Sequence, residues 1–247
     1  MIVREHFELR ETAVTIVADE RYLPEAKRSI FESRQVLEQF IAKDPFFRST
    51  LEPYREGKDA PPLIKRMCDA ARATNVGPMA AVAGAVAEAA VNAMVEAGSP
   101  HALVDNGGDI AMILDREVDI GIYAGRSRFS GLAFRFEPVD HVMGICTSSA
   151  TVGPSISFGV ADAAIVISDN VSLADACATM LGNMVVSNDD ALMADAVTRS
   201  MEVDGIIGCC AIAGDKIAMK GTIPRMVQAK GNFSKTSRIL FGPVRDK

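Results

Sequence analysis

The stretch that most constrains this fold covers residues 146–183, CTSSATVGPSISFGVADAAIVISDNVSLADACATMLGN. A hydroxyl-rich segment comes first, and Gly153 and Gly159 within it let a ligand approach the backbone closely. The apolar run AAIVI follows at residues 163–167, and a helical pattern begins near Ser172. The stretch therefore predicts a polar loop, a buried strand and a capped helix in direct succession.

The predicted helix carries Asp175 and Thr179, which are four residues apart and so share one face. Mg²⁺ binds oxygen ligands, typically one or two carboxylates together with phosphates and water, and this pair can supply two of them. The alternative is a capping box in which Ser172 is the N-cap and Asp175 replaces the usual glutamate. That alternative explains Asp175 without a ligand, but it does not explain Thr179.

Hydroxyl groups make the segment before the strand a candidate phosphate site, because hydroxyls and backbone N–H groups can hold an anion there. The segment is not a P-loop, since it lacks the Gly-Lys-Ser/Thr ending. The alternative is a polar connector without a ligand. The hydroxyl-bearing residues are Thr147, Ser148, Ser149, Thr151, Ser155 and Ser157.

A second candidate element is DNGGDI at residues 105–110, whose paired glycines and polar flanks can form a tight turn beside a ligand. Turns of this kind also close ordinary β-hairpins, which is the alternative. Cys146, with His141 upstream, is a candidate nucleophile because a Cys–His pair can produce a thiolate. The alternative for Cys146 is a small buried residue at the end of a strand.

The rest of the chain combines hairpins with helices, which favours an α+β fold over regular βαβ units. We expect a strand pair in residues 1–19, a β-hairpin about Gly214 and Asp215, further strands within 102–139, and helices at 24–42, 61–74, 77–98 and 191–202. The helix at 77–98 is rich in alanine around Gly84, so another element can pack very closely against it. On its polar edge, Glu88 is either solvated or faces a site.

Composition and charge exclude several partners. The net charge is −6, no run of lysine and arginine occurs and aromatic residues are only 6% of the chain, so nothing supports a nucleic-acid partner. The apolar run at 79–95 is interrupted by Glu88 and Asn92, and the N-terminus lacks a signal-peptide pattern, so no membrane partner is expected. The five cysteines show no metal-ligand spacing, which is typical of reduced thiols in a cytoplasmic protein.

No flexible linker divides the chain, which predicts one domain over residues 1–247. Its core is expected at 75–220, between N-terminal elements at 1–74 and a basic tail at 222–247. A similarity between residues 77–91 and 153–166 suggests internal duplication, since both have Gly-Pro, a later glycine and an acidic residue among alanines. We also expect a homo-oligomer, because strand edges tend to pair between subunits.

The order of these motifs resembles the ApbE family. After the alanine-rich helix come ALVDNGGDI at residues 102–110, a Thr-Ser segment at 146–149, a buried strand, and ADACAT at 174–179. Members of the family are flavin transferases, formerly described as thiamine-biosynthesis lipoproteins, which bind FAD and Mg²⁺ and move FMN onto a threonine of a partner protein. The resemblance covers roughly residues 75–185. It implies antiparallel sheets packed against helices, related to the tunnelling fold, with Asp175 and Thr179 as metal ligands.

The chain departs from the family pattern at two places. Ala83-Gly84 stands where the family has Lys-Gly, and GPSISFG stands where the family has a histidine. The lipoprotein signal is also missing, so this version is similar to a cytosolic prokaryotic branch of ApbE-like proteins. These differences favour binding over FMN transfer.

The leading hypothesis is a cytoplasmic ApbE-like protein that binds a phosphate-bearing ligand, FAD or FMN, next to Mg²⁺ held by Asp175 and Thr179. One alternative is an enzyme or accessory protein of sulfur metabolism that uses Cys146. Another is a non-catalytic structural or regulatory protein with a decayed site. In the leading hypothesis the ligand-binding residues are Asn106, Gly107, Gly108, Asp109, Thr147, Ser148, Ser149, Ser155 and Ser157.

Overall fold

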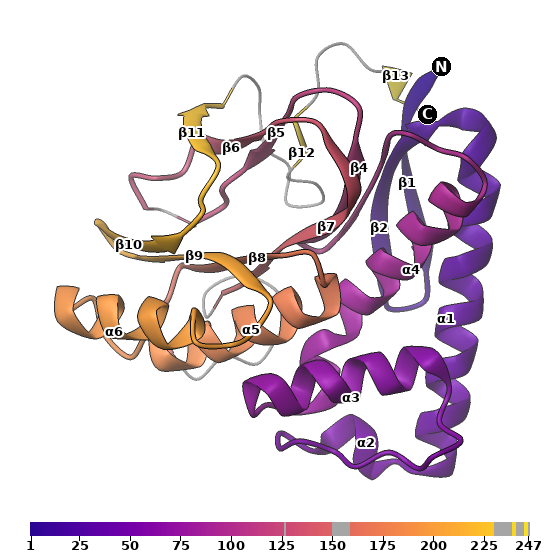
Figure 1. Cartoon of the computed structure of the whole chain (residues 1–247), viewed down its shortest axis with the longest axis horizontal. Helices are drawn as coiled ribbons and strands as arrows, with labels where there is room; N and C mark the ends of the chain where they lie inside the picture. Colours follow the sequence, from indigo (N-terminus) through magenta and orange to yellow (C-terminus); the bar gives the residue numbers. More distant parts are fainter. Residues whose placement is uncertain (126, 150–158, 230–238, 241–244, 247) are drawn as a thin grey trace.

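The chain folds into three layers, seen in a computed structural model that describes residues 1–125, 127–149, 159–229, 239–240 and 245–246. A nine-stranded sheet forms the middle layer, helices cover one of its faces, and a four-stranded sheet packs on the other (Figure 1). This is the predicted α+β fold of antiparallel sheets packed against helices.

The nine-stranded sheet has the order β10-β9-β8-β7-β4-β3-β2-β1-β13, and all its neighbours are antiparallel except β1 and β13. Its strands are β1 (Ile2–Leu9), β2 (Thr12–Asp19), β3 (Ala102–Asn106), β4 (Asp109–Leu114), β7 (Val139–Ser148), β8 (Ala163–Ser168), β9 (Ile206–Ala213), β10 (Lys216–Gly221) and β13 (Arg245–Asp246). Because β4 lies beside β7, the DNGGDI turn and the Thr-Ser segment come together at one end of the sheet.

The helical layer and the smaller sheet lie on opposite sides of this middle layer (Figure 1). The helices are η1 (Glu20–Tyr22), α1 (Leu23–Lys43), α2 (Phe46–Ser49), α3 (Pro62–Thr74), η2 (Pro78–Ala81), α4 (Val82–Glu96), α5 (Val171–Met184) and α6 (Asp190–Ser200). The smaller sheet has the order β11 (Arg225–Gln228), β6 (Leu132–Phe136), β5 (Val118–Gly121) and β12 (Ile239–Leu240).

Side chains alternate between the two faces along each strand, so the larger sheet contributes to a hydrophobic core on each face. In β8, Ala164 and Val166 pack towards the helices, whereas Ile165 and Ile167 pack towards the smaller sheet. The adjacent Cys209 and Cys210 likewise face opposite layers, as their positions in a strand predict. A third cluster, formed mainly by α1, α2, α3 and the start of α4, joins the N-terminal helices to this body.

Helix α4 lies within the helical layer, where it contacts α1, α5 and strands of the larger sheet. By length and composition alone Pro78–Glu96 could cross a membrane, which is weak evidence because buried core helices pass the same test. More than half of that window, 56%, is buried inside the protein. Its apolar side chains therefore have an internal role in this structure.

The suggested sequence repeat is not a structural repeat. Its first copy forms α4, whereas the described end of its second copy forms β8. Alanine and valine are compatible with both structures, and the tertiary environment decides between them. The predicted strand pair, the β9–β10 hairpin and the predicted helices are all present.

Candidate ligand and metal site

The site is built around a close contact between helices α4 and α5. Asp175 of α5 accepts a hydrogen bond from the backbone N–H of Gly84, with 2.8 Å between N and Oδ2. A Cβ atom at Gly84 would lie 2.7 Å from the Val171 carbonyl oxygen and 2.8 Å from the Asp175 Cβ. Only glycine therefore fits at this crossing, which explains the glycine within the alanine-rich helix.

Asp175 caps the N-terminus of α4 from a distant part of the chain. Ala81, the N-cap of α4, has no side-chain hydrogen bond of its own. The Asp175 carboxylate instead receives the free N–H groups of Ala83 and Gly84, in the positions that N-cap side chains normally serve.

The predicted capping box at Ser172 is wrong. The N-cap of α5 is Asn170, whose Oδ1 accepts the N–H of Leu173 at 3.0 Å. The helix thus starts earlier than the hydroxyl pattern suggested. Asp175 lies beyond that first turn and points to α4 rather than to its own helix terminus.

Strands β3, β4 and β7 supply the floor of the site. Asn106 pairs with Asp109 across the hairpin, and the Ile110–Ile145 pair places Cys146 next to Asp109 on the face towards the helices. The Asn106 amide donates to the Ala83 carbonyl at 3.1 Å, and the Thr147 N–H donates to Asp109 Oδ1 at 3.2 Å. The register of the sheet thereby brings Asp109 under Asp175 and the start of α4.

Two carboxylates consequently share one small region. Burial raises the pKa of Asp175 well above its usual range, and the nearby negative charge of Asp109 raises this pKa further. The N–H groups of Gly84 and Ala83 oppose both effects because they stabilise the ionised form. A carboxylate held like this gains from any cation that binds beside it.

The turn between the two strands has the geometry of a tight hairpin. Gly107 and Gly108 have φ angles of 72° and 111°, which favour glycine, and Asp105 Oδ1 accepts the Gly108 N–H at 2.8 Å. Asp105 is thus used to shape the turn, while Asn106 and Asp109 face the helices. The hairpin interpretation is confirmed, and the turn also brings Asp109 to the site.

The hydroxyl-rich segment is only partly a loop. Thr147 and Ser148 belong to β7, because the ladder with β8 continues to the Ser148–Ala164 pair. Ser148 is only 4% exposed, and its hydroxyl has no hydrogen-bond partner in the described part of the chain. Ser149 is also buried and Thr179 is half-buried. Thr151, Ser155 and Ser157 lie outside the described residues.

Cys146 does not form the predicted pair with His141. Its thiol is fully buried and directs a weak hydrogen bond to the Val171 carbonyl, with 3.6 Å between Sγ and O. Burial first, and then the charge of Asp109, raises the pKa of Cys146 well above its usual range. His141 is exposed and lies between Asp140 and Asp169, at 3.2 Å and 3.0 Å. The buried-residue alternative therefore describes Cys146 better than a thiolate nucleophile.

Glu88 is not on a solvated edge. It is only 9% exposed, and its carboxylate receives the Ser172 N–H at 3.2 Å and the Ser172 hydroxyl at 2.9 Å. Its other oxygen pairs with Arg66 of α3 at 2.7 Å. This ion pair could not be predicted from the sequence, because Arg66 lies in a different helix and shares no motif with Glu88.

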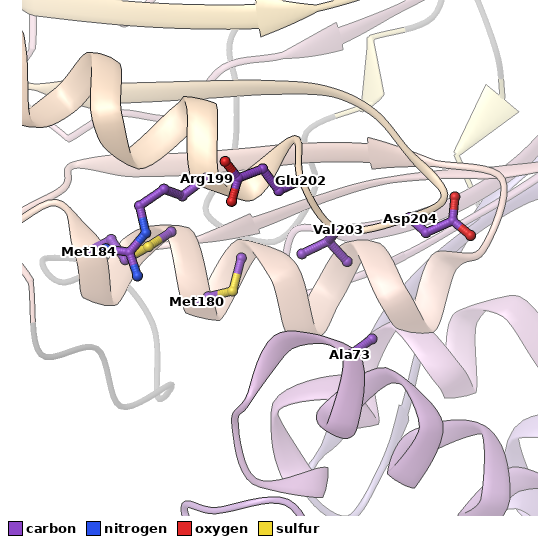
Figure 2. Close-up of a pocket in the computed structure, with 7 residues that line it drawn as sticks. All are labelled: Ala73, Met180, Met184, Arg199, Glu202, Val203 and Asp204. Carbon is purple, nitrogen blue, oxygen red and sulfur yellow. The ribbon is translucent and has the colours of Figure 1, made fainter.

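A cavity of about 400 Å³ lies elsewhere, between the end of α3, the second half of α5 and the end of α6 (Figure 2). Met180 and Met184 line it from α5. At 3.6 residues per turn these side chains point about 140° and about 180° away from Asp175 around the helix. The cavity is also lined by Arg199, Glu202 and Asp204, which carry charges of both signs. Because neither Asp109 nor Asp175 lines it, the cavity is separate from the Asp109–Asp175 region.

Comparison with known structures identifies the class of fold. The fold matches a Pseudomonas stutzeri flavinyl transferase ApbE in its apo form, with a TM-score of 0.56 and 11% identity over 90% of this chain and 95% of that one. It also matches a variant of flavin transferase ApbE from Vibrio cholerae, with a TM-score of 0.55 and 15% identity over 89% and 97% of the two chains. At these identities the likeness shows the fold, and the predicted ApbE-like fold is confirmed.

Sequence comparison identifies the family. A family model described as AbpE bacteria matches residues 3–216. A UPF0280 protein of Methanocella arvoryzae is 51% identical over 94% of both chains, and one of Methanococcoides burtonii is 49% identical over 92% of this chain and 96% of that one. The chain therefore belongs to the ApbE-like family that this model describes, and these two relatives carry the name UPF0280 protein.

Proposed function

We propose that this protein binds a phosphate-bearing ligand, a flavin nucleotide such as FAD or FMN, together with Mg²⁺ in the cytoplasm. Asp175 and Thr179 hold the cation, and Asp109 faces it from the sheet. Binding rather than FMN transfer is proposed, because Ala83 and GPSISFG replace the lysine and histidine positions of the family pattern.

The observation that supports this proposal most strongly is the meeting of Asp109 and Asp175. Segments that are far apart in the chain bring both carboxylates to the N-terminus of α4, where the charge of Asp109 disfavours ionisation of Asp175. Within the described residues, no arginine or lysine is among the groups that shift the pKa of Asp175. A divalent cation would remove this repulsion, and Mg²⁺ sites commonly use one or two carboxylates plus phosphate oxygens and water.

The chemistry of the surrounding groups fits this combination of metal and ligand. Within the described residues no cluster of three or more histidine, cysteine, aspartate or glutamate side chains is suited to a metal, so protein carboxylates alone would not complete its coordination. Phosphate oxygens and water are the natural remaining ligands. The buried Ser148 hydroxyl has no partner among the described residues, and such groups are usually satisfied by hydrogen bonds, here to a bound ligand.

Each residue has a defined part in the proposed binding. Asp175 and Thr179 contribute oxygen atoms to the cation from successive turns of α5, and Asp109 adds a second negative charge opposite them. Ser148, at the end of β7 and on the same face of the sheet as Cys146, donates a hydrogen bond to a phosphate oxygen, and Thr147 takes part through its backbone N–H, which holds Asp109 at 3.2 Å. Mg²⁺, when bound, supplies the positive charge that holds the phosphate near two carboxylates.

Calorimetric titration with FAD, with and without Mg²⁺, tests the proposal. We expect saturable FAD binding that is stronger with Mg²⁺, and we expect the Asp175→Ala variant to lose this Mg²⁺ effect. Asp195→Ala is the matched control, because Asp195 is an exposed aspartate on α6. Absence of binding, or equal Mg²⁺-dependent binding in the Asp175 variant, would show that the proposal is wrong.

A further inference from the structure

The contact between α4 and α5 has a second end that carries no assigned role. Asp175 of α5 reaches the first turn of α4, and Glu88 of α4 reaches the first turn of α5 at Ser172. Each helix therefore supplies a carboxylate to the N-terminus of the other. Asp175 accepts backbone N–H groups of α4, and Glu88 accepts the backbone N–H and the hydroxyl of Ser172 in α5. These hydrogen bonds fix where α5 begins relative to α4.

We propose that Glu88 is a positioning residue for Asp175, an inference that rests on the proposed function. Glu88 holds the first turn of α5 against α4, and this hold keeps the Asp175 carboxylate beside Asp109. Ser172 and Asp175 are three residues apart and so lie on the same side of α5. A movement of α5 at Ser172 would move Asp175 with it.

Electrostatics explains why such a hold is needed. The carboxyl groups of Asp109 and Asp175 meet at the start of α4, so like-charge repulsion favours positions of α5 in which they lie farther apart. Glu88 avoids adding to this repulsion because Arg66 neutralises it at 2.7 Å. The Arg66–Glu88–Ser172 chain thus opposes the separation of the metal-binding carboxylates.

Close packing prevents α5 from moving independently of α4. A Cβ at Gly84 would contact both Val171 O and Asp175 Cβ, so the helix backbones already touch between the two hydrogen-bonded ends. Gly144 of β7 gives the same side of α5 close access to the sheet, since a Cβ there would lie 2.7 Å from Val171 Cγ1. α5 therefore has little room to shift while Glu88 remains bonded to Ser172.

Mn²⁺ affinity, measured by electron paramagnetic resonance, tests this role with a metal probe for the Mg²⁺ site. We expect Glu88→Ala to weaken Mn²⁺ binding about tenfold, the size of effect seen for groups that orient metal ligands. Glu88→Gln should recover most of the affinity, because its amide oxygen still accepts the Ser172 hydroxyl. An unchanged Mn²⁺ affinity in Glu88→Ala would overturn the proposal.

A double-mutant cycle separates positioning from general stability. In an Asp175→Asn background, Glu88→Ala should cause no further loss of Mn²⁺ affinity, although it should still lower the melting temperature. Equal losses of Mn²⁺ affinity in both backgrounds would contradict positioning through Asp175. If Glu88→Ala does not fold, Ser172→Ala removes one of the same hydrogen bonds and takes its place in the cycle.

Amide hydrogen exchange gives a readout that does not depend on metal. If Glu88 positions Asp175, the Gly84 N–H should lose protection in Glu88→Ala while amides in the β9–β10 hairpin keep theirs. Failure of the wild-type protein to bind Mn²⁺ would refute the proposed function but leave this readout valid. Unchanged protection at Gly84 would refute the role of Glu88 by itself.

Discussion

The two ends of the α4–α5 contact use the same hydrogen-bonding device in opposite electrostatic surroundings. Glu88 accepts from Ser172 and has Arg66 as a counter-ion, whereas Asp175 accepts from Gly84 and faces Asp109. At one end a carboxylate is paired with a counter-ion, and at the other end two carboxyl groups meet. The difference indicates that the Glu88 end maintains the structure and that the Asp175 end is suited to a cation.

The helix N-termini differ in a second respect. α5 has its own N-cap, Asn170, in addition to Glu88, whereas α4 has no N-cap side chain of its own and depends on Asp175. Asp175 therefore serves both structure and proposed binding. Substitutions of Asp175 that remove its charge but keep its hydrogen bonds, or remove both, therefore test the difference between the two ends of the α4–α5 contact.

The largest expected effect follows substitution of Gly84. Gly84→Val would place a branched side chain where even a Cβ lies 2.7 Å from Val171 O, so α4 and α5 must separate. Overpacking typically costs about 1–3 kcal/mol, and at this backbone contact we expect the upper part of that range together with loss of Mg²⁺-dependent FAD binding. Urea unfolding measures the cost. Gly57→Val is the control, since a Cβ at Gly57 meets nothing within 4 Å, and equal losses in the two variants would contradict the close contact.

A smaller effect is expected when the Asp175 cap is removed. Asp175→Ala should lower the free energy of unfolding by about 1 kcal/mol, the usual cost of losing an N-cap side chain. Asp175→Asn should not, because its amide oxygen still accepts the Gly84 N–H and the repulsion from Asp109 disappears. Thermal unfolding without metal distinguishes the two variants. A larger loss of stability in Asp175→Asn than in Asp175→Ala would show that the hydrogen bonds of Asp175 are not what stabilises the fold.

The pH dependence of Asp175 sharpens the comparison further. Because its pKa is raised in the folded state, the native protein holds a proton that the unfolded chain releases near its ordinary pKa of about 3.9. The stability of the wild-type protein should therefore fall relative to Asp175→Asn as pH rises from about 4 towards the raised pKa. Unfolding of both proteins across this pH range measures the difference, and Mg²⁺ should reduce it for the wild type. A difference that stays constant with pH would contradict the raised pKa.

The smallest effect concerns an exposed contact near the start of α5. His141 lies between Asp140 and Asp169, and these carboxylates raise its pKa above its ordinary value. The contribution of His141 to the free energy of unfolding should be present below its unfolded-state pKa of about 6.5. It should disappear as pH rises through the raised folded-state pKa. Since exposed pairs contribute little, His141→Ala should cost at most about a few tenths of a kcal/mol at pH 6. Unfolding at pH 6 and pH 9 measures this, and a loss that grows with pH would contradict it.

Local patterns in the sequence were sufficient for most of the secondary structure. Hydrophobic periodicity predicted α1, the alanine-rich composition predicted α4, alternation predicted β1 and β2, and the Gly-Asp turn predicted the β9–β10 hairpin. The resemblance to ApbE proteins supplied the fold, which periodicity alone does not specify. Strand order was beyond the sequence argument, because it depends on pairings between residues far apart in the chain.

The sequence named two residues that the structure brings together, but not the contacts that do so. Asp109 and Asp175 were both named from local motifs, yet their proximity depends on the β4–β7 register and on the packing of α5. The roles of Gly84 and Glu88 arise from hydrogen bonds spanning 91 and 84 residues, for which short motifs carry no signal. Thr147 and Ser148 were assigned to a loop because polar residues at strand ends resemble connectors.

Anomalous X-ray scattering from crystals soaked in Mn²⁺ shows directly whether Asp175 binds a divalent cation. We expect one strong Mn²⁺ peak bonded to the Asp175 carboxylate, with Thr179 and Asp109 beside it, and loss of that peak in Asp175→Asn crystals. A Mn²⁺ peak elsewhere with Asp175 still bonded only to α4, or the same peak in both crystals, would contradict the account.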